Sequence, residues 1–199
     1  MEWKQFASRV LAFSKTGLKY SKDPYALENY EELKQLAQKQ LDETHLIHED
    51  AILYPKDAYP TPNVSVRIVV FNEDHKLLMV QERDDERYTV PGGWCDVFES
   101  PKENAVKEVL QETGLVVETT RLLAVFMRDR YKPRASMISE YVLYFEAKII
   151  GGTLQHNHET LHVDFYDLNQ LPNLSFKTSH FELSTALDIA VHHKEPYYD

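Results

Sequence analysis

The sequence predicts a mixed α/β protein, with an α+β arrangement in which a small helical domain precedes a larger domain built on a mixed β-sheet. Two observations carry this prediction. Apolar residues recur at steps of three and four over residues 3–41, the spacing of one face of a helix. After a proline-rich break, short apolar runs typical of strands surround a helical segment. Strands and helices that follow each other in this way pack as layers around a sheet.

Two amphipathic helices are expected in the first 42 residues. Asp23 followed by Pro24 is a typical N-cap with proline at the first helical position, so a second helix begins there. The apolar stripes are Trp3, Phe6, Val10 and Phe13 in the first helix, and Tyr30, Leu33, Ala37 and Leu41 in the second. A short helical pair cannot bury both stripes on itself, so we expect a homodimer organised by this segment.

A linker is expected where the helical periodicity fades, between about residues 48 and 62. Pro55, Pro60 and Pro62 interrupt this stretch. We therefore place an N-terminal helical domain with its linker at residues 1–60 and a second domain at residues 61–199.

The second domain is rich in strand-like segments. Residues 65–71 and 76–82 flank a turn of polar residues, which predicts a β-hairpin. One helix is expected between the early and late strands, and another at about residues 177–192. The later strands are expected at about residues 116–127, 138–150 and 161–167.

The composition excludes several classes of protein. The 199 residues, 43% of them hydrophobic, can build a well-packed domain with a small appendage. A net charge of −10 and a pI near 5.4 argue against general binding to duplex DNA or to an anionic membrane. No window reaches the roughly 20 apolar residues of a membrane-spanning helix, and the N-terminus does not resemble a signal peptide. A single cysteine, Cys95, forms no internal disulfide, so we expect a cytoplasmic protein.

The most informative stretch is PGGWCDVFESPKENAVKEVLQETGL at residues 91–115. Glu108 and Glu112 are one helical turn apart, and two such charges repel each other by about 0.2–0.5 kcal/mol unless a cation lies between them. An ordinary surface helix with solvated glutamates is the alternative. Gly92 and Gly93 permit a tight turn before the helix, and Gly114 fits the left-handed position that ends it. The apolar stripe expected to pack on the sheet is Ala105, Val106, Val109 and Leu110.

This stretch resembles the Nudix box, a pattern of glycines, glutamates and one arginine at fixed spacings. The positions that agree are Gly93, Glu99, Glu108, Val109, Glu112, Gly114 and Leu115. Two positions depart from the pattern, because Lys107 stands where arginine is usual and Gln111 replaces the first of two paired glutamates. The resemblance implies an α/β/α sandwich with a mixed sheet, and hydrolysis of a diphosphate linkage.

The resemblance also implies a metal site. Carboxylate oxygens favour Mg²⁺, with Mn²⁺ as a substitute, over zinc. Glu108 and Glu112 are then metal ligands and catalytic residues, Glu99 is an auxiliary ligand, and Gln111 offers only an amide oxygen. Lys107 keeps a positive charge but loses the two-pronged geometry of arginine.

A second region, HNHETLHVDFYDLNQLPNLS at residues 156–175, resembles the loop and strand that close many Nudix sites. It implies that Glu159 is a catalytic general base or a further metal ligand. The alternative is a zinc site formed by His156, His158 and His162, which lacks a cysteine partner.

Positive and aromatic side chains are expected to bind the substrate. Trp94, directly after the glycines, either stacks on a base or covers the core. The candidate phosphate contacts are Arg67 and Arg83 on expected strands, and Arg128, Arg130, Lys132 and Arg134 in the basic segment 128–134.

The segment YSKDPYALENYEEL resembles the N-terminal extension of a bacterial Nudix subgroup. This resemblance implies hydrolysis of a nucleoside diphosphate linked to another moiety, with a nucleoside monophosphate and phosphorylated X as products. CDP-choline is the leading candidate and ADP-ribose the second. Two alternatives remain open: a 3′–5′ exonuclease for short single-stranded RNA, in which Tyr131 stacks on a base, and a ligand sensor with weak catalysis.

Overall fold

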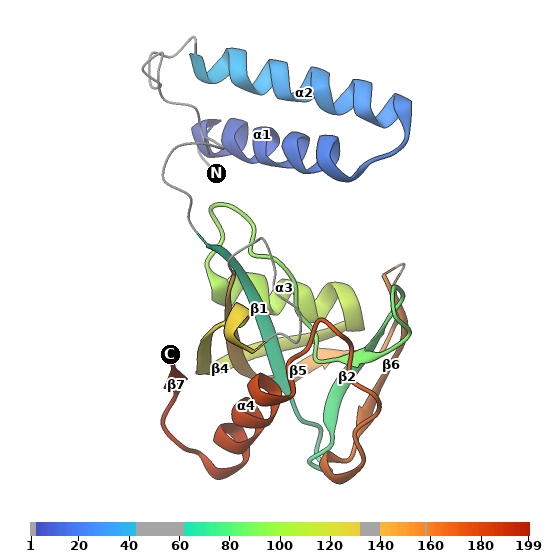
Figure 1. Ribbon diagram of the computed structural model, residues 1–199, viewed down its shortest axis with the longest axis vertical. Helices are drawn as coiled ribbons and strands as arrows, with labels where there is room; N and C mark the ends of the chain where they lie inside the picture. The colour runs from blue at the N-terminus through green and yellow to red at the C-terminus, as the bar shows by residue number, and fades with distance from the viewer. Residues whose placement is uncertain (1–2, 43–61, 132–139, 158) are drawn as a thin grey trace. The chain divides into compact units, whose positions relative to one another are not determined.

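The computed structural model describes residues 3–42, 62–131, 140–157 and 159–199 (Figure 1). The chain divides into two units, Met1–Pro60 and Thr61–Asp199. The first contains helices α1 (Trp3–Tyr20) and α2 (Pro24–Asp42). The Asp23 carboxylate accepts a hydrogen bond of 3.0 Å from the Tyr25 amide, which confirms the predicted N-cap. The two helices pack through Ala7, Leu11, Ala37 and Leu41.

The described residues of the second unit form seven strands, two α-helices and two 3₁₀ turns. The helices are α3 (Pro101–Thr113) and α4 (His180–His192), and the turns are η1 (Arg128–Arg130) and η2 (Leu168–Gln170). The strands are β1 (Asn63–Val70), β2 (Leu77–Glu82), β3 (Tyr88–Thr89), β4 (Leu115–Met127), β5 (Glu140–Gly152), β6 (Thr160–Tyr166) and β7 (Tyr197–Tyr198).

The strands form two sheets. The first is mixed, with the order β1-β5-β4-β7, and the second is antiparallel, with the order β3-β2-β6. The predicted hairpin of residues 65–71 and 76–82 is therefore wrong, because β1 and β2 belong to different sheets and share only the Phe71–Leu77 bridge. The physical reason lies in β1, whose residues from Ser65 to Val70 are all buried. Burial on both faces is typical of a strand in parallel pairing, and β1 pairs in parallel with β5 at the edge of its sheet rather than as half of a solvated hairpin.

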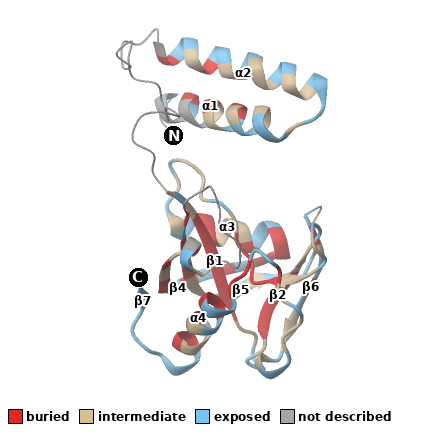
Figure 2. Cartoon of the chain, viewed as in Figure 1, coloured by how far each residue is buried: buried red, intermediate tan, exposed pale blue. Residues whose placement is uncertain are grey.

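Alternate residues of β1 and β2 enter two separate cores. Ile68 and Leu78 join the core that contains residues of α3, whereas Val69 and Met79 join the core that contains residues of α4. The two helices therefore cover opposite sides of the sheets, and buried residues concentrate in the strands and on the inward faces of both helices (Figures 1 and 2). The predicted α/β/α arrangement with a mixed sheet and preceding helices is confirmed.

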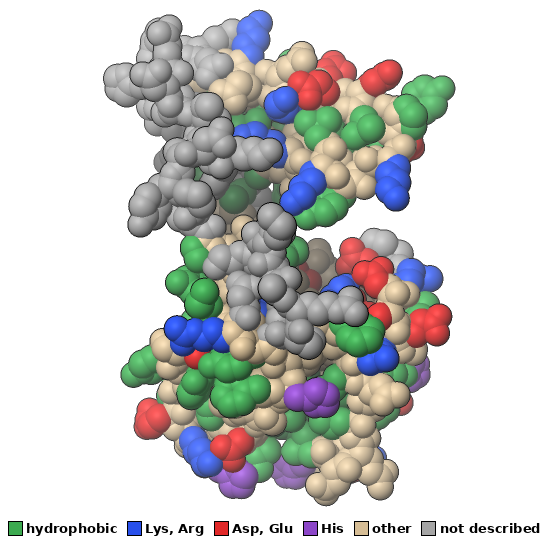
Figure 3. All heavy atoms as spheres, viewed as in Figure 1, with side chains coloured by type: hydrophobic (Ala, Val, Ile, Leu, Met, Phe, Trp, Pro, Cys, Tyr) green, Lys and Arg blue, Asp and Glu red, His purple; other side chains and the backbone are tan. Residues whose placement is uncertain are grey.

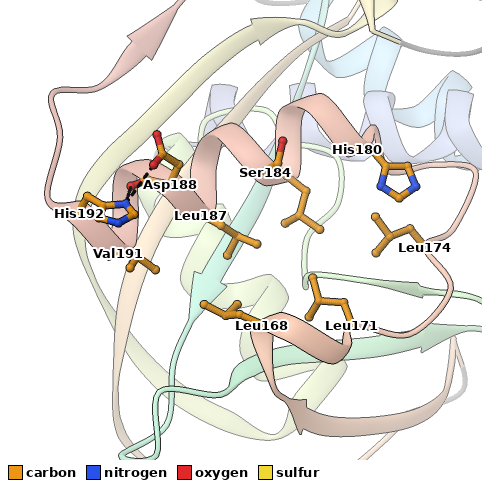
Figure 4. Close-up of a pocket in the computed structure, with 10 residues that line it drawn as sticks. Leu168, Leu171, Leu174, His180, Ser184, Leu187, Asp188, Val191 and His192 are labelled. Carbon is orange, nitrogen blue, oxygen red and sulfur yellow. Dashed lines mark hydrogen bonds and ion pairs between the residues drawn. The ribbon is translucent and has the colours of Figure 1, made fainter.

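An apolar hollow of about 360 Å³ lies between α4 and the segment around η2. Leucines of the two elements face each other across it, and the ion pair of His192 with Asp188 lies at one end (Figure 4). In the part of the chain that the structure describes, no helix has both the length and the apolar character needed to cross a membrane.

Candidate active site

The helix of the box, α3, begins and ends where its sequence dictates. The Ser100 hydroxyl accepts a hydrogen bond from the Glu103 amide, and the Glu103 carboxylate accepts one from the Ser100 amide, so both groups cap the helix. Gly114 ends it with φ 72°, in the predicted left-handed conformation. Three members of the predicted apolar stripe pack on the core, but Leu110 is 48% exposed, so its assignment to the stripe was wrong. The remaining face carries the carboxylates.

Glu108 and Glu112 both face the turn formed by Gly92 and Gly93. The Gly92 amide donates a hydrogen bond of 2.9 Å to Glu112 Oε2. A Cβ atom at Gly93 would lie 2.7 Å from Glu108 Oε1, and a Cβ atom at Gly92, whose φ is +149°, would collide with the Val66 carbonyl oxygen. Gly93 therefore lets the backbone approach the Glu108 carboxylate this closely, and Gly92 lets it approach the backbone of β1.

Burial makes the ionised form of both carboxylates unfavourable. Burial raises the pKa of Glu112 to about 8, although its hydrogen bond from Gly92 and the nearby Arg67 oppose the shift. Burial likewise raises the pKa of Glu108, against the charges of Lys107 and Arg67. The nearby charges of Lys107 and Arg67 do not outweigh the effect of burial on these two carboxylates. A divalent cation bound between the carboxylates would stabilise their ionised form. The donor set of hard oxygens fits Mg²⁺ or Mn²⁺.

Two further carboxylates, on other elements, act electrostatically on this pair. The charge of Glu159, before β6, adds to the burial that raises the pKa of Glu108, and the charge of Glu82, at the end of β2, acts in the same way on Glu112. Acidic side chains gather near the ends of β2 and β6 in the space-filling view, with basic side chains beside them (Figure 3). Glu82 could not be recognised from the sequence, because only its pairing with Thr160 across β2 and β6 places it here.

The structure does not contain a complete cage for a metal. Within the described ranges, no three His, Cys, Asp or Glu side chains are close enough to hold an ion. Mg²⁺ commonly takes one or two carboxylates and completes its shell with water and substrate phosphate, so Glu108 and Glu112 still fit it. The histidine alternative gains no support, because His156 and His162 are exposed and form no such group. Its third member, His158, lies outside the described residues.

Lys107 fastens the loop before α3 to the helix. Its ammonium group lies 2.5 Å from Asp96 Oδ2 and 2.5 Å from Glu99 Oε2. The Asp96 amide also donates to the Asn104 side chain, which is fully buried. The lysine therefore binds two carboxylates at separate points, where an arginine would offer a two-pronged contact. Glu99, the predicted auxiliary ligand, is held in this ion pair, and Asp96 was not recognised from the sequence.

Gln111 lies at the exposed end of the box helix. Its side chain is exposed, and its backbone carbonyl accepts a hydrogen bond of 3.0 Å from the Asn157 side chain. Glu159, two residues beyond Asn157, is also exposed. Both predicted positions therefore lie where solvent or a ligand can reach them.

Comparison with known proteins identifies the family. A model of the NUDIX domain matches residues 61–187. The chain belongs to the Nudix family. A second model, described as a UDP-X-like N-terminal oligomerisation domain, matches residues 1–45. The predicted enzyme class, a Nudix hydrolase of diphosphate bonds, is confirmed.

Several relatives match most of the chain. YjhB of Bacillus subtilis, whose name assigns it provisionally to the ADP-ribose pyrophosphatases, is 33% identical over 96% of this chain and 93% of its own length. The crystal structure of a UDP-X diphosphatase is 31% identical over 98% of this chain and 96% of that chain, with a TM-score of 0.67. An ADP-ribose pyrophosphatase structure from Streptococcus suis is 37% identical over 70% of this chain and 100% of that chain, with a TM-score of 0.61.

Two arginines predicted to contact substrate phosphates are buried within the Nudix domain. Arg128 is 4% exposed, and its guanidinium lies 2.6 Å from Glu140 and 3.9 Å from Glu182. Arg67 is 5% exposed, and its Nη1 donates to the Gly92 carbonyl at 2.5 Å. Both side chains are directed at protein groups. Arg128 binds buried glutamates, and Arg67 supports the glycine turn.

Three of the other predicted contacts lie in the described residues and are exposed. Arg83 is exposed, and its amide donates to the Glu159 carbonyl at 3.3 Å. This bond places it beside the acidic cluster, by which we mean Glu82, Glu108, Glu112 and Glu159. Trp94 is 52% exposed, so its ring does not serve mainly to cover the core. Arg130 has an exposed side chain 3.8 Å from Asp199. Lys132 and Arg134 lie outside the described residues.

One face of the Tyr131 ring is already stacked on another aromatic side chain of the protein. Its ring is stacked on Phe181 with centroids 4.5 Å apart, and it contacts Phe126 edge to face. Its hydroxyl donates to Asp199 at 2.5 Å. The structural role of this tyrosine removes the main residue on which the RNA exonuclease alternative depended.

Proposed function

We propose that this protein hydrolyses the diphosphate of a nucleoside diphosphate linked to another moiety, and releases a nucleoside monophosphate and phosphorylated X. The observation that carries the proposal is the pair of Glu108 and Glu112, which meet the Gly92–Gly93 turn inside a Nudix box. ADP-ribose is placed ahead of CDP-choline, because the names of the relatives refer to ADP-ribose and to UDP-X.

Each side chain has a defined task in this proposal. Glu108 and Glu112 would hold Mg²⁺, which supplies charge neutralisation of the diphosphate and acidification of water when bound. Glu159, exposed at the edge of the cluster, would accept the proton of the attacking water. Arg83 and Trp94 are accessible for the phosphates and the base. Lys107 would keep Glu99 close to the site through their ion pair.

A substrate panel tests this function directly. Release of AMP, UMP or CMP would be measured from ADP-ribose, UDP-glucose and CDP-choline in Mg²⁺, beside loss of nucleotides from a short RNA oligomer. We expect turnover of at least one of the three diphosphates, and a loss of at least about 100-fold in the Glu112→Gln variant. Turnover of RNA alone, or full activity of Glu112→Gln, would refute the proposal.

We also propose that the protein is a homodimer organised by α1 and α2. Phe6, Phe13 and Tyr20 follow each other at steps of seven on α1 and are 50–66% exposed. On α2, Tyr25 and Leu36 are 80% and 57% exposed and lie on nearly the same side, since eleven residues make about three turns. Each helix therefore has a second apolar stripe away from the packed one. Tyr30 does not belong to it, because its ring packs over Gly17.

Sedimentation of charge variants tests the dimer. We expect Phe13→Glu and Leu36→Glu to sediment as monomers at micromolar concentration, because a buried charge opposes association. The control is Lys22→Glu, which changes an exposed residue between the helices and should leave the dimer intact. The dimer proposal would be contradicted if the wild-type protein were monomeric, or if both charge variants remained dimers.

A further inference from the structure

The loop that leads to β6 caps the C-terminal end of the box helix. The last carbonyls of an α-helix have no partner within the helix and must find one elsewhere. In α3, the Leu110 carbonyl accepts from the Gly114 amide, and the Thr113 carbonyl accepts from the Gln155 amide at 2.9 Å. The Gln111 carbonyl accepts from Asn157 Nδ2 at 3.0 Å, and the Glu112 carbonyl accepts from Thr160 Oγ1 at 3.4 Å.

Asn157 is the link between this helix end and the residue proposed as the base. Its Oδ1 accepts hydrogen bonds from the amides of Glu159, at 2.8 Å, and Thr160, at 3.0 Å. Its Nδ2 donates to the carbonyl of Gln111, the residue before Glu112. A single side-chain amide thus joins the backbone of Glu159 to the backbone beside Glu112, because the amide group offers a carbonyl acceptor and an NH₂ donor side by side.

We propose that Asn157 is a positioning residue that fixes Glu159 relative to Glu108 and Glu112. This inference rests on the proposed function. The backbone of Glu159 sets the point from which its exposed side chain extends toward the site. Asn157 holds that backbone to the same helix that carries the two box carboxylates. A base misplaced by about 1 Å can lower the rate about 100-fold, so the loss of this link should act on turnover rather than on substrate binding.

The experiment compares four variants in the full-length chain: Asn157→Ala, Asn157→Asp, Glu159→Gln and the double variant Asn157→Ala with Glu159→Gln. We expect Asn157→Ala to lower kcat on ADP-ribose about 10- to 100-fold with little change in KM. In the Glu159→Gln background the same substitution should have almost no further effect on kcat, because the group it positions is already absent. Asn157→Asp keeps the acceptor but loses the donor to Gln111, so it should fall between Asn157→Ala and wild type.

A matched control lies in the same loop. Gln155→Ala removes an exposed side chain but keeps the backbone hydrogen bond to Thr113, and should leave kcat within about two-fold of wild type. Amide hydrogen exchange gives a readout that does not depend on activity. The amides of Glu159 and Thr160 should lose protection in Asn157→Ala and keep most of it in Asn157→Asp.

The possible failures are distinguishable. Wild-type protein without turnover on any diphosphate would overturn the proposed function, while exchange protection would still decide whether Asn157 holds the loop. With an active wild-type enzyme, the positioning role is overturned by unchanged kcat in Asn157→Ala. It is also overturned if Asn157→Ala lowers kcat in the Glu159→Gln background by the same factor as in wild type. Unaltered exchange protection of the amides of residues 159 and 160 in Asn157→Ala would overturn it as well.

Discussion

Glu112→Gln separates the metal site from the fold, because the glutamate is buried at 9% exposure and burial raises its pKa to about 8. The folded protein therefore binds the proton of this group more tightly than the unfolded chain, whose pKa is 4.5. The contribution of this tighter proton binding to the free energy of unfolding is fully present below about pH 4.5 and is lost as the pH rises to about 8. Each pH unit in that window lowers the free energy of unfolding by up to about 1.4 kcal/mol.

The glutamine variant should lack this pH dependence, because its amide resembles the protonated carboxyl and still accepts from Gly92. Between pH 5.5 and 8.5, the wild-type protein should lose up to about 3 kcal/mol relative to Glu112→Gln. The assay is urea denaturation of both proteins in EDTA at the two pH values, so that titrating groups that do not interact with Glu112 cancel in the difference. Glu195→Gln, at an exposed position, is the control and should follow wild type.

The outcome that would refute this reasoning is a stability difference between wild type and Glu112→Gln that does not change with pH. Burial would then not be the source of the shift, and the argument that a cation relieves it would fail. A turnover assay completes the test. Glu112→Gln should be at least as stable as wild type, yet nearly inactive with Mg²⁺. An ordinary surface helix predicts the reverse, with activity kept and stability changed by only a few tenths of a kcal/mol.

Three further substitutions have defined outcomes. In Gly93→Ala the added Cβ would lie 2.7 Å from Glu108 Oε1 and displace that carboxylate, so kcat should fall about 10- to 100-fold. The circular dichroism spectrum should be unchanged. Unchanged turnover would count against the position assigned to Glu108. Gln111→Glu adds a carboxylate next to the pair, so the half-saturating Mg²⁺ concentration should fall; an equal or higher value would place residue 111 outside the metal's surroundings. Arg128→Met leaves Glu140 buried without its 2.6 Å partner and should lower the free energy of unfolding by about 3–5 kcal/mol in urea. Arg130→Met, at an exposed pair, should change it by less than about 1 kcal/mol, and equal effects would refute the structural role of Arg128.

Interactions within a few residues were predictable from the sequence. The caps of α3 depend on Ser100, Glu103 and Gly114, which all lie within one turn of the helix ends. The facing of Glu108 and Glu112 follows from the helical repeat alone. The exposure of Leu110 was not predictable in this way, because the width of a buried stripe depends on what packs against it. The N-cap at Asp23 was predictable for the same local reason.

The pairing of strands and the fate of distant charges could be decided only by the tertiary structure. A short turn between residues 70 and 77 favours a hairpin locally, but β1 pairs in parallel with β5, a strand more than 70 residues away in the sequence, and its residues from Ser65 to Val70 are buried. Arg128 belongs to a basic segment in the sequence, yet in the fold it is enclosed by Glu140 and Glu182. The sequence by itself determined the box helix and the chemistry it carries, since those rest on local spacing and local hydrogen bonds. The tertiary structure decided that the charge of Glu82 acts on Glu112 and that Asn157 bonds to the helix, because only the packed sheets bring these segments together.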